Sequence, residues 1–194
     1  IIIRLIRPWF LIRWKELWSS RIGLFVTETE LYCCEHDAGI NSPSQRYLDF
    51  FYLKKLVCNK QLEKMWRRNL IILPSWLLIP VVKVNRFINI FVPGGNYHEI
   101  SEIGKDIVRD IPNVIERFQA HISFTKEEEV KGKRILKDMG IPENAKFVCL
   151  NVRDSGYLDR HEKSKLIRWS YHDYRNADKE KYVLAPEELV RRGY

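Results

Sequence analysis

Arg153 and Asp154 are the residues whose types and position are best suited to chemistry. They follow a short apolar run at 147–152, FVCLNV, that turn-forming residues bound on both sides, and we predict a buried parallel strand there. Ligands of open α/β sheets bind beyond the carboxyl ends of strands, and a guanidinium at such a place suits phosphate oxygens. The pattern indicates an anion site at Arg153. The alternative is pairing of Arg153 with Asp154 or Asp173, which would only hold the next loop in place, and the short pattern alone favours this alternative.

The segment that follows, 155–176, is predicted to be a long loop rich in basic and aromatic residues. Loops of this length without secondary structure are usually functional or disordered. Aromatic rings beside basic groups can stack on a nucleobase or a sugar while the basic groups hold a diphosphate. The candidates for this role in the loop are Tyr171, His172, Tyr174, Arg175 and Asn176. Packing roles for the two tyrosines are the alternative.

The elements that must position these residues alternate between strands and helices, which favours the α/β class. Further predicted strands, apolar or rich in aromatic residues, lie at 10–14, 47–53 and 70–73. Predicted helices lie at 22–35, with Ser19 or Ser20 as the cap, and at 60–69. The apolar stretch 70–82 is shorter than the about 20 residues that a membrane-spanning helix needs, and we interpret it as a buried strand or a short helix.

The clearest helix of the sequence begins at Thr125 and ends at Gly140. Thr125 and Glu128 have the spacing of a capping box, acidic residues come first and basic ones last, and Gly140 provides a C-terminal cap. We interpret this helix as the bridge between an N-terminal lobe, 1–122, and the beginning of a second lobe, 123–194. Helical sequence returns at Lys179, where Pro186 either kinks the helix or lies in the first turn of a shorter one.

The composition is that of a folded protein, and its positive charge fits anionic partners or, as an equal alternative, an ordinary basic surface. Hydrophobic residues make up 45% of the 194 residues, which excludes a disordered chain, and the net charge is +8. Nucleotide phosphates, an acidic membrane surface and nucleic acid all fit this charge. The first 14 residues carry three arginines with Trp9, Phe10 and Trp14, and could lie on an anionic membrane; a strand with an adjoining basic loop is the alternative we favour.

Other polar residues give weaker signals. The four cysteines have no metal-ligand spacing, the histidines lack an HxxxH pattern, and no convincing DxD-like motif is present, so we expect no metal site and no cofactor. The cysteines are interpreted as reduced thiols of a cytoplasmic protein. Glu99 and Glu102, near a predicted loop at 92–96, could supply a general base or be solvated surface carboxylates.

Two stretches near the C-terminus carry a family resemblance: FVCLNVRDSGYL at 147–158 and WSYHDYRN at 169–176. Together with further matches they closely resemble a family of bacterial glycosyltransferases encoded in surface-polysaccharide clusters. The further matches are at 20–23, 29–32, 37–39, 49–53, 93–95, 123–129, 182, 185, 188–189 and 193–194. The resemblance therefore covers nearly the whole chain.

The resemblance implies a GT-B-like fold with a Rossmann-like N-terminal lobe. The nucleotide sugar would be bound mainly by the C-terminal lobe, and a glycan or lipid-linked acceptor by the N-terminal lobe. Acceptor-side candidates in the matched stretches are Arg21, Gly23, Gly94 and Gly95. Arg153 is also similar to the arginine of the HVRR motif of fucosyltransferase-like enzymes, which holds the nucleotide diphosphate.

Several features depart from these patterns. Leu24 stands where the family is expected to have His, and Asn151 and Asp154 stand where HVRR has His and its second Arg. The chain has no initial Met, Ile1 to Ile3 read like the middle of a strand, and Tyr194 precedes most of the expected nucleotide lobe. We therefore expect a fragment that is inactive alone. The rival interpretation is a non-enzymatic basic nucleic-acid-binding module, which ranks lower because no recognised nucleic-acid motif is present.

Overall fold

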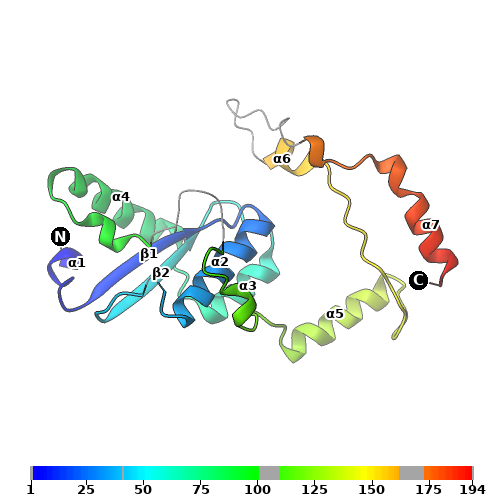
Figure 1. Cartoon of the computed structure of the whole chain (residues 1–194), viewed down its shortest axis with the longest axis horizontal. Coiled ribbons are helices and arrows are strands. Elements are labelled where there is room, and N and C mark those ends of the chain that lie inside the picture. Colours follow the sequence, from blue (N-terminus) through cyan, green and yellow to red (C-terminus); the bar gives the residue numbers. More distant parts are fainter. Residues whose placement is uncertain (1, 41, 101–109, 162–172, 194) are drawn as a thin grey trace. The chain divides into compact units, whose positions relative to one another are not determined.

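The computed structural model describes residues 2–40, 42–100, 110–161 and 173–193. The chain divides into two compact units, Ile1–Thr125 and Lys126–Tyr194, which we call the N-terminal and the C-terminal unit (Figure 1). The described residues form a mixed α/β structure with seven α-helices and one two-stranded parallel sheet. None of the described helices is both long enough and apolar enough to cross a membrane.

The sheet lies in the N-terminal unit. Strand β1, Leu11–Leu17, pairs in parallel with β2, Tyr47–Leu53, so that Leu11 lies opposite Tyr47 and Leu17 opposite Leu53. The predicted strand 47–53 is confirmed, and the one predicted at 10–14 is present but extends to Leu17.

Pairing continues for one residue at each edge of this sheet. The strand predicted at 70–73 is reduced to one parallel bridge, between Ile72 and Phe51, and a second bridge joins Trp14 to Glu99. Ile72 is nevertheless buried, as predicted for that stretch. The sheet therefore has β1 and β2 at its centre and single bridging residues on either side.

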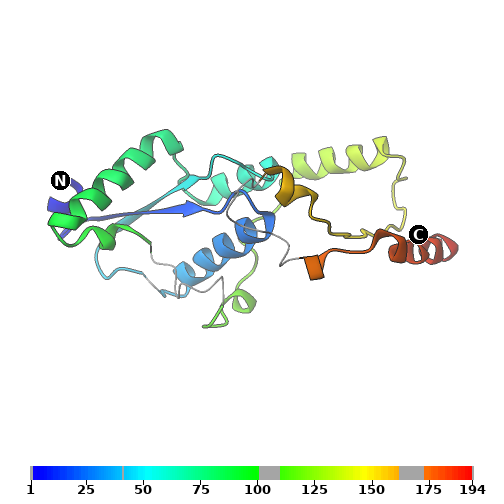
Figure 2. The ribbon, with the colours of Figure 1, turned by 90° about the horizontal axis from the view of Figure 1, so that it is seen from above.

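Helices cover both faces of the two strands (Figure 2). Phe51 and Leu53 pack in one core with helix α2, Ile22–Asp37, and helix α3, Lys60–Asn69. Tyr52 packs in a second core with helix α4, Ser75–Phe91. The alternation follows from the two-residue period of a strand, whose successive side chains point to opposite faces. The helices predicted at 22–35 and 60–69 are thus confirmed.

Three local predictions in this unit are wrong. Ser19 and Ser20 do not hold the N-cap position of α2, which is Arg21; the Ser19 hydroxyl instead donates to the carbonyl of Leu56, at 3.0 Å. The start of the chain is helical, α1 at Ile2–Leu5, where the sequence suggested a strand. The apolar stretch at 70–82 contributes to α4, which runs on to Phe91 with Pro80 in its interior, and is longer than the short helix predicted.

The C-terminal unit is built from helices. Helix α5, Lys126–Asp138, ends as predicted at Gly140, whose φ of 85° is the left-handed conformation that glycine adopts without strain. The N–H groups of Gly140 and Ile141 donate to the carbonyls of Lys137 and Leu136, which is the Schellman pattern. Helix α6 spans Gly156–His161, and Pro186 lies in the first turn of α7, Leu184–Arg191.

The buried strand predicted at 147–152 is not formed. Phe147 and Val148 are both 49% exposed, and the whole run has irregular backbone. A strand needs a neighbour for its backbone hydrogen bonds and a core for its side chains. The described residues of the C-terminal unit include no other strand and no buried residue, so the apolar run has neither.

Candidate functional site

Arg153 lies close to the C-terminal end of the loop predicted at 155–176. The backbone N–H of Ala177 donates to the carbonyl of Arg153 at 2.9 Å, which brings Arg153 beside the short 3₁₀ turn at 173–175. The two ends of the segment 155–176 are therefore close together. Arg153, Arg175 and Asn176, which the sequence placed in one site, come from these two ends.

At these two ends of the segment, some side chains make hydrogen bonds to nearby residues and others are exposed. The Asp154 carboxylate accepts from the N–H of Gly156 at 3.0 Å, at the start of α6. The carboxylate of Asp173 accepts from the side-chain amide of Asn176 at 3.1 Å. Tyr174 is 82% exposed, so the packing role considered for it is wrong in this structure. Arg175 is exposed too, whereas Tyr171 and His172 lie outside the described residues.

The four acceptor-side candidates do not form one site. Arg21 and Gly23 lie at the start of α2, beyond the carboxyl end of β1. Gly94 lies by Arg7, which precedes the amino end of β1. A strand of this length separates its ends by roughly 20 Å. The candidates therefore fall into two pairs at opposite ends of β1.

Gly94 and Gly95 serve the packing of the chain's first helix. Gly94 has a φ of 111° and accepts weakly from Arg7, at 3.4 Å. The N–H of Gly95 donates to Asn89 Oδ1 at 2.6 Å, and its carbonyl accepts from Asn85 Nδ2 at 3.0 Å. A Cβ at Gly95 would lie 2.5 Å from the guanidinium of Arg4. A side chain at Gly95 would therefore displace Arg4 and Asn89.

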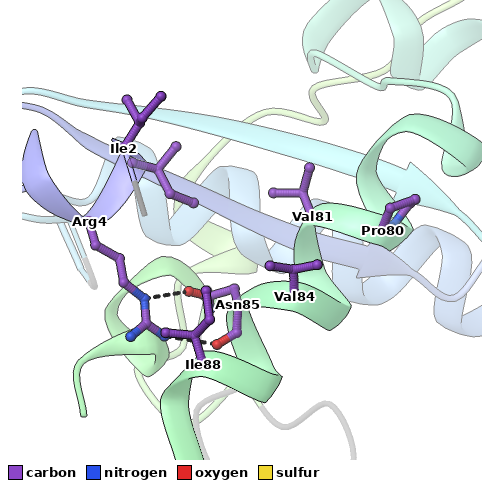
Figure 3. A pocket seen from close by; sticks show the side chains of 8 residues that line it. Ile2, Arg4, Pro80, Val81, Val84, Asn85 and Ile88 are labelled. Carbon is purple, nitrogen blue, oxygen red and sulfur yellow. Dashed lines mark hydrogen bonds between the residues drawn. The ribbon is translucent and has the colours of Figure 1, made fainter. Parts of the chain in front are cut away.

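An apolar groove of about 580 Å³ runs between α1 and α4 (Figure 3). Arg4 crosses it, donating from Nε and Nη2 to the side chain and the carbonyl of Asn85 at 3.0 and 2.8 Å. The groove is lined by Ile2, Ile3, Arg4, Pro80, Val81, Val84, Asn85 and Ile88. Trp9, which is not among the lining residues, is 76% exposed.

Trp14, grouped with Trp9 as a membrane contact in the sequence, is 2% exposed. It stacks on the buried ring of His98, with centroids 5.4 Å apart. Its role as a membrane contact is therefore wrong, because it lies inside the core between β1 and α4.

Glu99 does not have the environment of a free base. Both of its oxygens accept from Arg86, at 2.8 and 2.9 Å, which ties Glu99 to α4. This pair fits the interpretation of Glu99 as a surface carboxylate better than that of a general base. Glu102 lies outside the described residues.

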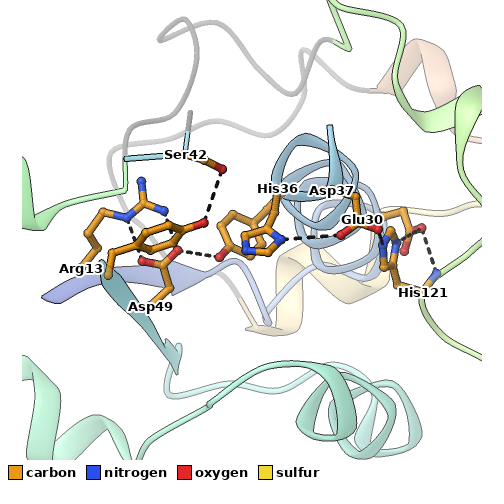
Figure 4. A network of polar contacts seen from close by, with 9 residues as sticks. Arg13, Glu30, His36, Asp37, Ser42, Asp49 and His121 are labelled. Carbon is orange, nitrogen blue, oxygen red and sulfur yellow. Dashed lines mark hydrogen bonds and ion pairs between the residues drawn. The ribbon is translucent and has the colours of Figure 1, made fainter. Parts of the chain in front are cut away.

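The N-terminal unit contains a polar network that passes from the sheet along α2 (Figure 4). At the sheet, Arg13 and Asp49 form a buried ion pair, and the Tyr32 hydroxyl donates to Asp49 at 2.6 Å. Burial, and then this hydrogen bond to the carboxylate, raise the pKa of Tyr32 above its ordinary value. Tyr32 therefore remains a neutral donor.

At the other end of this network His121 lies between two carboxylates of α2. Its Nδ1 is 2.9 Å from Glu30 Oε1 and its Nε2 is 3.1 Å from Asp37 Oδ2. Burial lowers the pKa of His121, but the hydrogen bonds to Glu30 and Asp37 outweigh burial and the net shift is upward. A carboxylate accepts only, so both contacts are satisfied together when each ring nitrogen carries a proton.

Cys34 completes a cluster with Glu30 and His121. Its Sγ is 3.9 Å from Glu30 Oε1, and the ligand atoms of the three residues all lie within 4.8 Å of one another. Burial, and then the Glu30 carboxylate, raise the pKa of Cys34 to about 11, which keeps the thiol protonated at neutral pH. The donor set, one thiol, one imidazole and one carboxylate, is of a kind that binds transition metals.

Comparisons with known proteins identify no relative. No protein-family model, no curated protein and no solved structure matches this chain.

The sequence contained only part of the signal for the Glu30–Cys34–His121 cluster. Glu30 and Cys34 are four residues apart, which places them on one face of the predicted helix. His121 is 87 residues beyond Cys34, and only the fold brings it there. The spacing rules that led us to expect no metal site cover ligands close in sequence and miss such an arrangement.

Proposed function

We propose that this protein belongs to a glycosyltransferase that moves a sugar from a nucleoside-diphosphate sugar to a surface-glycan or lipid-linked acceptor. The chain would supply the N-terminal lobe of a GT-B-like enzyme and the first part of the nucleotide-binding lobe. The observation that carries the proposal is the hydrogen bond from Ala177 to Arg153, which brings the two described ends of the segment with the family-like sequence together at this arginine.

Arg153 is the proposed diphosphate ligand. Arg153 is half-buried. The hydrogen bond from Ala177 to its carbonyl holds the turn at 173–175 beside it, and that turn carries the exposed side chains of Tyr174 and Arg175. A guanidinium can donate two parallel hydrogen bonds to phosphate oxygens, and charge develops on the leaving diphosphate in the transition state. Arg153 would neutralise that charge, while Tyr174 and Asn176, with Asp154, Tyr171 and His172 from the same segment, would line the nucleotide sugar. No cofactor is required.

The test is donor binding by Arg153→Ala and by a matched control, Arg134→Ala. Arg134 is an exposed arginine of α5, outside the proposed donor-binding segment, and its removal changes the net charge by the same amount. Titration calorimetry with uridine and guanosine diphosphate sugars should show a loss of about 10-fold or more for Arg153→Ala only, since one charged hydrogen-bond partner contributes about 1.5–3 kcal/mol. Turnover is measured in a form extended beyond Tyr194. Equal binding by both variants would refute the role of Arg153.

The same titration separates the rival function. A basic nucleic-acid-binding module would bind oligonucleotides with an affinity that falls steeply with salt, because many phosphates release counterions. A glycosyltransferase should respond to a single nucleoside diphosphate sugar. The net charge of +8 motivates the rival, but a donor site at Arg153 needs one diphosphate only.

A lipid-linked acceptor would place the enzyme at the cytoplasmic face of a membrane. We propose peripheral contact with anionic lipid through the start of the chain, where Ile2, Leu5 and Trp9 are each at least 66% exposed. Sedimentation with vesicles containing phosphatidylglycerol should retain the protein, and Trp9→Ser should release it. Equal sedimentation with purely zwitterionic vesicles would contradict the electrostatic part of the proposal.

A further inference from the structure

The Glu30–Cys34–His121 cluster, of which Figure 4 shows Glu30 and His121, has the geometry of a metal site. In a tetrahedral zinc site with bond lengths of about 2.0 Å to oxygen and nitrogen and 2.3 Å to sulfur, the atoms of a nitrogen, oxygen and single-sulfur donor set lie roughly 3.3–3.5 Å apart. The Nδ1–Oε1 distance of 2.9 Å and the Sγ–Oε1 distance of 3.9 Å lie on either side of that range. Side-chain movements that bring the three ligand atoms, which now lie within 4.8 Å of one another, to these separations would accommodate an ion.

The ring of His121 is oriented for this role. Asp37 Oδ2 lies 3.1 Å from Nε2 and can keep the proton on that nitrogen, so that loss of the Nδ1 proton would leave a lone pair directed toward Glu30. Metal-binding histidines usually donate their other ring N–H to a carboxylate, which fixes the tautomer and raises the basicity of the ligand. Asp37 would be the positioning residue of such an arrangement.

The backbone of His121 is also fixed. Its N–H donates to Glu30 Oε1 at 3.1 Å, and its carbonyl accepts from Asn69 Nδ2 of α3 at 2.6 Å. Arg68 of the same helix donates to the carbonyl of Ser123 at 2.7 Å. Helices α2 and α3 thus hold the segment that delivers the third ligand, so the three donor groups converge before any ion binds.

We propose that Glu30, Cys34 and His121 bind one divalent transition-metal ion of the zinc type, with Asp37 positioning the imidazole and a fourth position open to water. The ion would displace the proton between Nδ1 and Oε1 and the thiol proton of Cys34, and both protons would pass to solvent. A mixed sulfur, nitrogen and oxygen donor set favours zinc or cobalt over magnesium or calcium. This inference is independent of the proposed glycosyl transfer.

The test uses cobalt as a spectroscopic substitute for zinc. The full chain is prepared as Cys149→Ala, because Cys149 is the exposed thiol and would bind metal non-specifically. Addition of cobalt should produce a thiolate-to-cobalt charge-transfer band that saturates at one ion per chain and disappears when zinc is added. A folded protein, judged by circular dichroism, that shows no such band at millimolar cobalt would overturn the proposal.

Variants assign the ligands. Cys34→Ala should abolish the charge-transfer band, while Cys33→Ala, the adjacent buried thiol of the same helix, should leave it unchanged. Asp37→Asn should weaken zinc affinity about 10- to 100-fold, as loss of an outer-shell carboxylate does. If Cys34→Ala binds as tightly as its parent, the site is wrong. Should Cys34→Ala fail to fold, the band in the parent protein and its loss on addition of zinc still decide the outcome.

Discussion

Arg13 and Asp49 form a buried, bidentate ion pair between the two strands of the sheet. Arg13 Nε and Nη2 donate to the two carboxylate oxygens at 2.7 and 2.6 Å. The residues lie directly opposite each other in the parallel register, and their side chains are 9% and 6% exposed. Tyr32 of α2 donates to the same carboxylate, so one interaction joins both strands and the helix that connects them.

Removing one partner of this pair should be costly. We expect Asp49→Asn to lower the free energy of unfolding of the N-terminal unit by about 3–5 kcal/mol, because the Arg13 charge stays buried without its counter-charge. Urea denaturation monitored by circular dichroism measures the change. The double variant Arg13→Met with Asp49→Leu should lose less than the sum of the single changes.

The control for this prediction is Lys60→Gln, in an exposed pair with Glu63 of the same unit. Its lysine is 79% exposed, and pairs of this kind contribute about 0–1 kcal/mol. If Asp49→Asn is no more damaging than Lys60→Gln, the buried pair does not stabilise the fold as argued.

A side chain at Gly95 should destabilise the fold. In Gly95→Ala the new Cβ would lie 2.5 Å from Arg4 Nη2 and 2.9 Å from Asn89 Oδ1, so the contacts that hold α1 on α4 must shift. We expect a loss of about 1–3 kcal/mol in the free energy of unfolding, typical of overpacking. Gly23→Ala is the matched control, because nothing lies within 4 Å of its Cβ position. Equal stability of the two variants would contradict the steric argument.

Amide exchange should distinguish the irregular run 147–152 from a true strand. Because the backbone there is irregular and its apolar side chains are exposed, we expect rapid hydrogen exchange at Val148, Leu150 and Val152. Amides of β2 provide the internal standard, since they are paired with β1. Protection of 147–152 comparable to that of β2, measured by mass spectrometry after peptic digestion, would show that the run is paired in solution.

The difference between β2 and the run 147–152 shows what local pattern can and cannot predict. Both stretches are apolar and similar in length, and both were predicted to be strands. At Tyr47–Leu53 the prediction is confirmed because β1 supplies hydrogen-bond partners and two helix layers supply a core. At 147–152 the described residues of the C-terminal unit supply neither. The pattern of apolar residues describes one segment alone, whereas a β-strand forms only when a second segment pairs with it.

The same contrast between local pattern and tertiary contacts holds for other elements and for the candidate sites. Helix α3 and the cap at Gly140 depend on neighbours in sequence and were predicted well. Other features depend on the path of the chain through β1 and α2. Gly23 is separated from Gly94, and His121 approaches Glu30, and neither relationship could be predicted from the spacing of these residues in the sequence. Whether Arg153 binds a diphosphate stays a prediction.

The last prediction concerns the pH dependence of stability through His98. This residue is fully buried, with Nδ1 2.7 Å from the carbonyl of Ile12. Burial lowers the pKa of His98 below its ordinary 6.5; the contact with Ile12 opposes that shift, and the charges of Arg4 and Arg7 add to it. The unfolded chain therefore binds a proton more readily than the folded one. The contribution of a neutral His98 is complete above about pH 6.5 and is lost as the pH falls below that value.

The variant His98→Asn isolates this effect, because its side-chain amide can still donate to the Ile12 carbonyl but cannot titrate. We expect the wild-type free energy of unfolding to fall more steeply than that of His98→Asn between about pH 6.5 and 5. Denaturant titrations at a series of pH values measure both slopes. All other titrating groups are shared, so the difference between the two curves reports His98. Parallel curves would mean that the buried ring takes up its proton in the folded state as easily as in the unfolded chain.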